Sequence, residues 1–232
     1  MKQIQNSLCY SVFFLVVVLL AGCGGGETPT PEPTATPTSV PVVDNTITIV
    51  AMGDSLTEGF GVDFDQAYPA QLEQRLLADG YDIEVINAGI SGETSSGALS
   101  RVDWVLTLNP DIVILETGPN DGLRGIDPEL TRSNMNALVE TFQDNEVVVV
   151  LAGMQIVQNM GDAYVEQFRG IYPSVAETYE LALIPFFLDG VGGVAELNQA
   201  DAVHPTAEGY TIVVETVYPY VTDALAEVLA TQ

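Results

Sequence analysis

The stretch DIVILETGPNDGLRG, residues 111–125, places a run of branched apolar residues directly before a glycine-rich polar turn. Residues 112–115 are apolar without interruption, and residues 147–151 form a second run of the same kind. Strands that are buried on both faces have such sequences, because helices cover both sides of a parallel sheet. The two runs therefore predict central strands of an α/β fold.

Similar short runs recur between residues 46 and 229 and alternate with longer amphipathic stretches. The predicted strands are Thr46–Met52, Ile83–Ala88, Ile112–Thr117, Val147–Ala152 and Leu183–Phe187. The predicted helices lie near residues 67–79, 94–107, 128–143, 161–180 and 206–229. This alternation predicts a doubly wound, three-layer α/β/α fold around a five-stranded parallel sheet. In such folds the ligand site lies at the carboxyl ends of the strands.

The predicted strand ends carry residues that could act together in catalysis. Ser55 follows the first strand, but a serine hydroxyl is a weak nucleophile and needs an adjacent base. His204 is the only histidine in the chain, so a serine–histidine enzyme has no other imidazole to use. Asp201 can accept a hydrogen bond from the ring nitrogen that faces away from Ser55 and can stabilise the imidazolium. We therefore expect Ser55 as nucleophile, His204 as general base and Asp201 as the orienting carboxylate.

A serine nucleophile also requires hydrogen-bond donors for the oxyanion that develops during acyl transfer. The candidates are the backbone N–H groups of Ser55 and Gly92 and the side-chain amide of Asn120. Gly92 has no Cβ, so its backbone can approach a substrate closely. Asn120 supplies two N–H donors without a charge that would alter the protonation of His204.

Each of these residues has a simpler explanation when it is taken alone. Ser55 and Asn120 occur in sequences typical of turns, and Asp201 with His204 could cap the helix that begins near Pro205. The same pair could form half of a metal site, but no second histidine and no cysteine of the mature chain lies nearby. The order of these residues at successive strand ends favours catalysis without a metal ion.

Residues 1–22 have the pattern of a signal peptide. Their apolar run, residues 12–20, is shorter than the roughly 20 residues that a membrane-spanning helix needs. The run leads into LAGC at 20–23, which resembles the lipobox of bacterial lipoproteins. We expect cleavage before Cys23 and lipidation of its thiol, with an ordinary signal peptide as the alternative.

Residues 23–44 are rich in proline and threonine, which predicts an extended spacer before a single domain of residues 45–232. Cys9 lies in the leader, so the mature chain retains only Cys23 and no disulfide is expected. These features predict an extracytoplasmic protein that a lipid anchor holds at the cell membrane. We expect it to be a monomer.

The chain has a formal net charge of −26 and only six basic residues. Such an acidic surface repels nucleic acids and anionic membrane surfaces, so neither is an expected partner. The expected partners are a small ester or lipid substrate and the membrane that the lipid anchor enters.

Four sequence blocks, taken together, resemble the SGNH or GDSL hydrolase superfamily. They are GDSL at 53–56, NAGISGETS at 87–95, GPND at 118–121 and DAVHP at 201–205. Further stretches are similar to its thioesterase/lysophospholipase/arylesterase branch, namely NDGLRG at 120–125, MQI at 154–156, IYP at 171–173 and PFF at 185–187. The resemblance implies a flavodoxin-like SGNH fold with strand order 2-1-3-4-5. It also implies the same roles for Ser55, Gly92, Asn120, Asp201 and His204, an acyl-Ser55 intermediate and no cofactor.

Two residues depart from the pattern of this branch. Pro119 stands where glycine is common, and because proline fixes φ and lacks an N–H, we expect a slightly altered loop around Asn120. Glu93 stands where aspartate is frequent. It is predicted to lie at a loop edge, where the exchange should have little effect.

Substrate selection is predicted for the apolar loop Gly153–Met160, together with Leu123 and the stretch Leu188–Leu197. Methionine and branched side chains suit an adaptable acyl groove, although they could instead pack the edge of the domain. The predicted substrate-binding residues are Asp54, Leu123, Met154, Ile156, Val157 and Met160.

The predicted activity is that of a serine esterase acting on carboxylic esters and thioesters. In the resembling branch, substrates are acyl thioesters, aryl or short-chain esters and lysophospholipids. A carbohydrate O-deacetylase is the second hypothesis. The apolar loop suits acyl chains, and Trp104, which could stack on a sugar, is predicted in a helix away from the strand ends, so both features disfavour this hypothesis. A third reading is an inactive surface-binding lipoprotein, which would have no chemical reason to keep His204 and Asp201.

Overall fold

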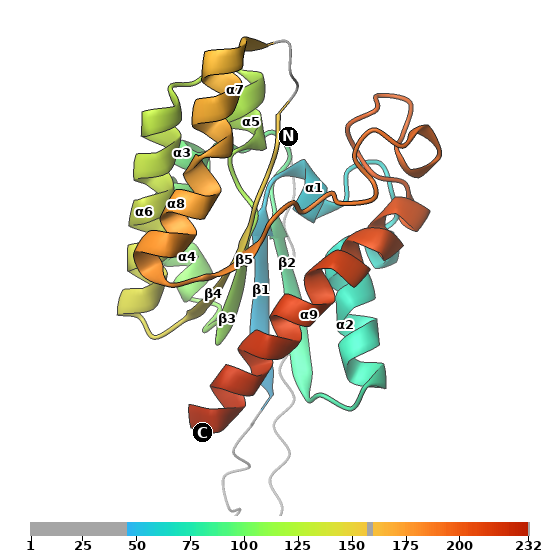
Figure 1. Ribbon diagram of the computed structural model, residues 1–232. Coiled ribbons are helices and arrows are strands. Elements are labelled where there is room, and N and C mark those ends of the chain that lie inside the picture. The colour runs from blue at the N-terminus through green and yellow to red at the C-terminus, as the bar shows by residue number, and fades with distance from the viewer. Residues whose placement is uncertain (1–45, 157–159, 232) are drawn as a thin grey trace, which may run out of the picture. The chain divides into compact units, whose positions relative to one another are not determined.

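Five parallel strands form a sheet in the order β2-β1-β3-β4-β5 in the computed structural model, which describes residues 46–156 and 160–231 (Figure 1). The strands are β1 (Ile47–Gly53), β2 (Ile83–Gly89), β3 (Ile112–Leu115), β4 (Val148–Ala152) and β5 (Ala182–Ile184). The predicted strand order and the five predicted strands are confirmed.

Helices cover both faces of this sheet. They are α1 (Ser55–Glu58), α2 (Tyr68–Ala78), α3 (Ser95–Ser100), α4 (Val102–Leu106), α5 (Pro119–Leu123), α6 (Pro128–Asp144), α7 (Asp162–Arg169), α8 (Ile171–Tyr179) and α9 (Ala207–Thr231), with the 3₁₀ helices η1 (Phe64–Gln66) and η3 (Ala195–Leu197). Helices α2 and α9 pack together on one face, and α6 packs with α3 and α8 on the other (Figure 1). The predicted three-layer α/β/α architecture is therefore confirmed.

The two runs of branched residues that predict the sheet lie in its buried centre. All four residues of β3 and residues 49–52 of the neighbouring β1 have no exposed surface, and the same holds for residues 150–152 of β4. Burial of each large apolar side chain contributes about 1.5–3 kcal/mol to stability. Hydrophobic burial therefore fixes the central strands, and with them the positions of the turns at their carboxyl ends.

Two predicted helices are each divided in two. The helix predicted at 94–107 consists of α3 and α4, which meet at Arg101. The guanidinium of Arg101 donates to the carbonyl oxygen of Ala88 at 2.8 Å, so this residue is held at the sheet edge rather than inside a continuous helix. The helix predicted at 161–180 consists of α7 and α8, separated by Gly170, and glycine weakens a helix through its conformational entropy.

Three further differences lie at strand ends. The fifth strand ends at Ile184 rather than Phe187, because the following Pro185 has no N–H to donate to a neighbouring strand. The third strand ends at Leu115 rather than Thr117, three residues before Gly118 turns the chain with a φ of 108°. The short helices α1 and α5 lie where the sequence predicts turns.

The predicted signal peptide, the lipid anchor at Cys23 and the proline-rich spacer lie outside the described residues, so they remain predictions. Within the two described ranges, none of the helices combines the length and apolar character needed to cross a membrane.

Candidate active site

Ser55 is the first residue of the one-turn helix α1, directly after the central strand β1. The side chain of Asp54 caps this helix, because its Oδ1 accepts a hydrogen bond from the backbone N–H of Leu56 at 2.9 Å. Gly59 ends the helix in the left-handed conformation, with a φ of 85°. Asp54 and Gly59 hold the Ser55 hydroxyl at the carboxyl edge of the sheet. A short helix occupies this position, where the sequence predicts a turn.

The structure brings His204 and Asp201 to Ser55. The Nε2 atom of His204 lies 2.9 Å from the Oγ of Ser55, and its Nδ1 lies 2.7 Å from an Oδ2 of Asp201. The other carboxylate oxygen of Asp201 accepts from the backbone N–H groups of Val203 and His204, at 2.9 and 3.0 Å. The turn from 201 to 204 thus orients both the carboxylate and the imidazole, and a proton can pass from Ser55 to His204.

The same hydrogen bonds determine the charge of Asp201. The backbone N–H and the ring of His204, followed by the N–H of Val203, lower the pKa of Asp201 to about 2. Its carboxylate is therefore ionised at neutral pH and can stabilise a protonated His204.

Gly92 and Asn120 line one cavity of about 230 Å³ together with Ser55 and His204. Gly92 has a φ of 77°, a conformation that favours glycine, and its carbonyl oxygen accepts a hydrogen bond of 2.8 Å from Arg124. The Nδ2 of Asn120 donates to an Oδ2 of Asp54 at 2.8 Å. The predicted oxyanion donors thus border the same space as the predicted nucleophile.

Pro119 does not displace Asn120. It occupies the first turn of α5, where a missing backbone N–H leaves no helical hydrogen bond unmade. The preceding Gly118 adopts a φ of 108°, and a Cβ at that position would lie 2.6 Å from the hydroxyl of Tyr172. The structure thus accommodates the proline by forming a short helix, and Asn120 reaches the cavity from it.

Glu93 is held more firmly than its predicted place at a loop edge implies, and the small effect expected of the exchange with aspartate stays a prediction. Glu93 pairs with Arg101 through two hydrogen bonds of 2.7 and 2.6 Å, and only 8% of its side chain is exposed. Because Arg101 also donates to the carbonyl of Ala88, this pair fastens the loop that carries Gly92 to the end of β2. Glu93 is therefore a buried structural anchor rather than a residue at a loop edge.

A larger apolar cavity of about 470 Å³ adjoins the Ser55 cavity, and Leu56, Pro119, Leu123 and Val203 line both. Of the predicted substrate-binding residues, Leu123, Met154 and Ile156 line this apolar groove. Met160 lies near Gly125 instead and lines neither cavity. Val157 lies outside the described residues.

Asp54, another predicted substrate-binding residue, lines the Ser55 cavity but is almost fully buried. Only 2% of Asp54 is exposed, and its two carboxylate oxygens accept hydrogen bonds from Leu56 and Asn120. These hydrogen bonds hold other residues of the site, and a direct role in substrate binding stays a prediction.

Several residues of the site were not predicted. The ring of Phe60 lies 4.7 Å from the ring of His204, between centroids, and Phe60 is half exposed. Phe186 and Leu188, after β5, line the apolar groove. Leu188 belongs to the stretch predicted for substrate selection, whereas Phe186 lies in the PFF stretch and was not predicted to line a groove. An aromatic residue so soon after the nucleophile was a signal for Phe60.

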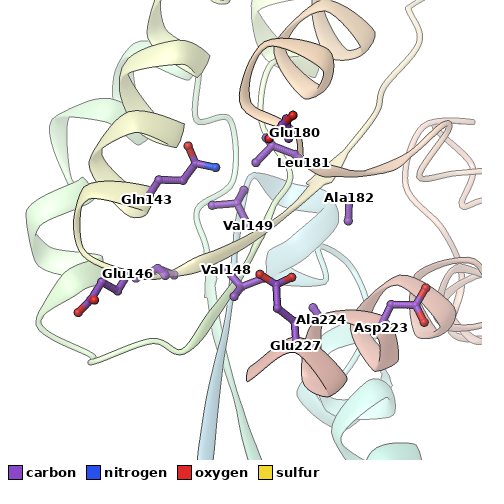
Figure 2. A pocket seen from close by; sticks show the side chains of 11 residues that line it. Gln143, Glu146, Val148, Val149, Glu180, Leu181, Ala182, Asp223, Ala224 and Glu227 are labelled. Carbon is purple, nitrogen blue, oxygen red and sulfur yellow. The ribbon is translucent and has the colours of Figure 1, made fainter. Parts of the chain in front are cut away.

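A separate cavity of about 380 Å³ lies at the opposite end of the sheet, between the starts of β4 and β5 and helix α9 (Figure 2). Glu146, Glu180 and Glu227 are among its lining residues. Across the described part of the chain, no three His, Cys, Asp or Glu side chains are arranged to hold a metal ion. The residues that line this cavity include no serine, cysteine or histidine, in contrast to those of the Ser55 cavity.

The fold and the Ser55 site together define a class of protein, the serine ester hydrolases built on a doubly wound α/β sheet. The family model described as the GDSL-like Lipase/Acylhydrolase family matches residues 51–212. The chain belongs to this family, and it is an ester hydrolase, as the sequence predicted.

Relatives with named activities agree with this family. Esterase TesA of Pseudomonas aeruginosa is 40% identical over 173 residues, covering 74% of this chain and 86% of the relative. The Escherichia coli protein named thioesterase 1/protease 1/lysophospholipase L1 is 31% identical over 183 residues, covering 78% and 83%. The solved structure of the esterase EstA from Pseudoalteromonas sp., inhibited by monoethylphosphonate, matches with a TM-score of 0.74 and 32% identity, covering 77% and 98%.

Proposed function

We propose that this protein hydrolyses esters and thioesters of apolar acyl chains through an acyl intermediate on Ser55. The observation that carries the proposal is the hydrogen-bonded series from Asp201 through His204 to Ser55, with distances of 2.7 and 2.9 Å. In this mechanism Ser55 is the nucleophile, His204 the general base and Asp201 the carboxylate that stabilises the imidazolium.

The reaction proceeds in two halves. The Ser55 Oγ attacks the carbonyl carbon while its proton moves to the Nε2 of His204, and the oxyanion accepts hydrogen bonds from Ser55, Gly92 and Asn120. The alcohol then leaves with the proton from His204. A water molecule attacks the acyl-enzyme and gives a proton to His204, which returns it to the Ser55 Oγ as the bond to the acyl group breaks and the carboxylic acid leaves.

The apolar groove supports an acyl chain as the substrate feature that the enzyme recognises. Met154, Ile156 and Leu188 line it, and it continues from the Ser55 cavity past Leu56 and Val203. The leaving group then occupies the side of the Ser55 cavity that Phe60 and Ser91 border. The named activities of the relatives extend this proposal to lysophospholipids, aryl esters and thioesters as substrate classes.

A carbohydrate O-deacetylase would leave this groove empty, because an acetyl group ends close to Ser55. Hydrolysis of p-nitrophenyl esters from acetyl to palmitoyl separates the two readings, with the full chain and its Ser55→Ala variant compared. We expect a Ser55-dependent rate that peaks at medium chain length. Activity confined to the acetyl ester would contradict the acyl-groove proposal and favour the deacetylase.

The proposed location is the extracytoplasmic face of a membrane, with a lipid on Cys23 as anchor. Its support is the sequence alone: the apolar run at residues 12–20, LAGC at 20–23 and the proline-rich spacer that follows. At this address, membrane lysophospholipids or small environmental esters are more accessible substrates than cytosolic thioesters.

A further inference from the structure

Two carboxyl side chains lie buried next to the proposed nucleophile. Asp54 precedes Ser55 and is 2% exposed, and Glu116, which follows β3, has no exposed surface. The backbone N–H of Asp54 donates to the Oε2 of Glu116 at 3.1 Å, and the two carboxyl groups lie close enough to affect each other's protonation. Two ionised carboxylates so close together in a buried site repel each other, which favours a proton on one of them. The pair therefore holds one proton.

The surrounding donors place this proton on Glu116. Both oxygens of Asp54 accept hydrogen bonds, from the N–H of Leu56 and from the Nδ2 of Asn120, as an ionised carboxylate does. The Oε2 of Glu116 also accepts two, from the backbone N–H of Asp54 at 3.1 Å and from the hydroxyl of Thr57 at 2.9 Å. Its Oε1 is buried and has no donor facing it. A buried oxygen without a donor is costly as a carboxylate, whereas a protonated oxygen can itself donate a hydrogen bond.

The environment of the pair agrees with a neutral Glu116. Burial, followed by the negative charge of Asp54, raises the pKa of Glu116 well above its usual range. Three buried tyrosines lie near the Glu116 carboxyl group, namely Tyr68 of α2, Tyr172 of α8 and Tyr210 of α9. Burial raises the pKa of each hydroxyl, so these tyrosines remain uncharged.

The end of β1 leaves room for Glu116. A Cβ on Gly53 would lie 2.5 Å from the Oε2 of Glu116 and 2.1 Å from the hydroxyl oxygen of Thr57. A glycine at this position thus allows the carboxyl group to reach the backbone N–H of Asp54. The hydrogen bond from the backbone N–H of Asp54 to Glu116 therefore depends on the first residue of the GDSL block.

We propose that Glu116 is a positioning residue that stays protonated and donates its proton to Asp54, which in turn holds the amide of Asn120. With one N–H of Asn120 bound to Asp54, the amide cannot rotate, and the second N–H on the same nitrogen is available to the oxyanion. The inference rests on the proposed function, since it concerns the orientation of the Asn120 amide as a donor to the oxyanion.

Two substitutions of Glu116 test whether its side chain acts as an uncharged hydrogen-bond donor. In Glu116→Gln, the amide oxygen can accept hydrogen bonds from the backbone N–H of Asp54 and the hydroxyl of Thr57. The amide N–H can donate to the side-chain carboxylate of Asp54. In Glu116→Leu, a side chain of similar size offers neither. We expect Glu116→Gln to retain at least about a third of wild-type kcat, and Glu116→Leu to lose about tenfold to a hundredfold in kcat with KM little changed. Equal losses in the two variants, or full activity of Glu116→Leu, would overturn the proposal.

Infrared spectroscopy gives a readout that does not depend on turnover or on the folding of Glu116→Leu. At pH 8, where exposed carboxyl groups are ionised, the wild-type-minus-Glu116→Gln difference spectrum should contain the carbonyl band of a protonated carboxylic acid. The band should shift in D₂O. Its absence would overturn the assignment of the proton. Lack of any Ser55-dependent turnover by the wild type would instead contradict the proposed function, and the band would still test Glu116.

Discussion

At the scale of single residues, the site depends on hydrogen bonds that set the charge of each acid. Asp201 accepts from two backbone N–H groups and the His204 ring, which keeps its pKa low at about 2. Asp54 accepts from Leu56 and Asn120 although it is buried. The proposed mechanism therefore uses a carboxylate on each side of Ser55, one to stabilise the base and one to hold an oxyanion donor.

The replacement of Asp201 by asparagine tests the first of these carboxylates. An amide of the same shape cannot stabilise protonated His204 and can favour the wrong ring tautomer, so we expect kcat to fall by about 10²- to 10⁴-fold. The measurement is turnover of p-nitrophenyl butyrate at pH 8. Asp189→Asn, at an exposed aspartate after β5, is the matched control and should keep wild-type activity. A value of kcat for Asp201→Asn within threefold of wild type would contradict the role.

The same variant should change how stability depends on pH. Since the folded pKa of Asp201, about 2, lies below its ordinary value of 3.8, the carboxylate stabilises the fold above about pH 4. That contribution is lost as the pH falls towards 2. Urea unfolding at pH 6 and pH 2.5 should show that the stability advantage of wild type over Asp201→Asn is smaller at the lower pH. A larger difference at pH 2.5 would show that the hydrogen bonds do not favour the charged form.

At the scale of helices, strands and loops, the site is assembled from the turns at the ends of β1, β2 and β3 and the segment before α9. The strands could be predicted because uninterrupted branched runs have few alternatives. The helices α1 and α5 could not, because a single turn is too short to show an amphipathic period. Asp54 caps α1 and Pro119 occupies the first turn of α5, but neither role was predicted from the sequence.

The loop after β2 depends on the ion pair of Glu93 with Arg101. Their side chains are only 8% and 12% exposed, so Glu93→Ala leaves an unpaired buried cation and should lower the free energy of unfolding by about 3–5 kcal/mol. Urea denaturation measures this. Glu166→Ala removes an exposed pair with Arg169, 3.9 Å apart, and should cost about 0–1 kcal/mol. Equal effects of the two variants would mean that the Glu93 pair does not anchor the loop.

The apolar groove can be shortened from the segment after β5. Leu188→Trp places a larger side chain on the groove wall, so we expect the ratio of kcat/KM for the decanoyl ester to that for the acetyl ester to fall at least about tenfold. Leu77→Trp, at a half-exposed leucine of α2, controls for added bulk and should leave the ratio unchanged. An unchanged ratio in Leu188→Trp would place the acyl chain elsewhere.

At the scale of the whole molecule, sequence reasoning succeeded where one residue type had one possible role and failed where packing decides. A single histidine left no choice of base, and its partners follow from the order of the strands. The walls of the groove, by contrast, include Phe186 and Ala202, whose PFF and DAVHP stretches are recognisable in the sequence but meet only in the folded chain. Glu93 was misjudged for the same reason, since its partner Arg101 lies in what the sequence presented as a continuous helix.

The proposed attachment to a membrane is also a property of the whole chain. Cys23→Ser removes the thiol that would carry the lipid, so we expect the protein to move from the membrane fraction to the soluble extracytoplasmic fraction. Cys9→Ser, inside the predicted leader, is the control and should leave the protein at the membrane. Retention of Cys23→Ser in the membrane fraction would contradict the lipid anchor.

The central claim is that Ser55 is a nucleophile activated by His204, and a fluorophosphonate probe tests it most directly. We predict one covalent adduct per folded wild-type chain, located by mass spectrometry on the peptide that contains Ser55. The adduct should be absent from Ser55→Ala and should form at least about a hundredfold more slowly in His204→Ala. No adduct on folded wild-type protein, or an adduct on another residue, would contradict the account.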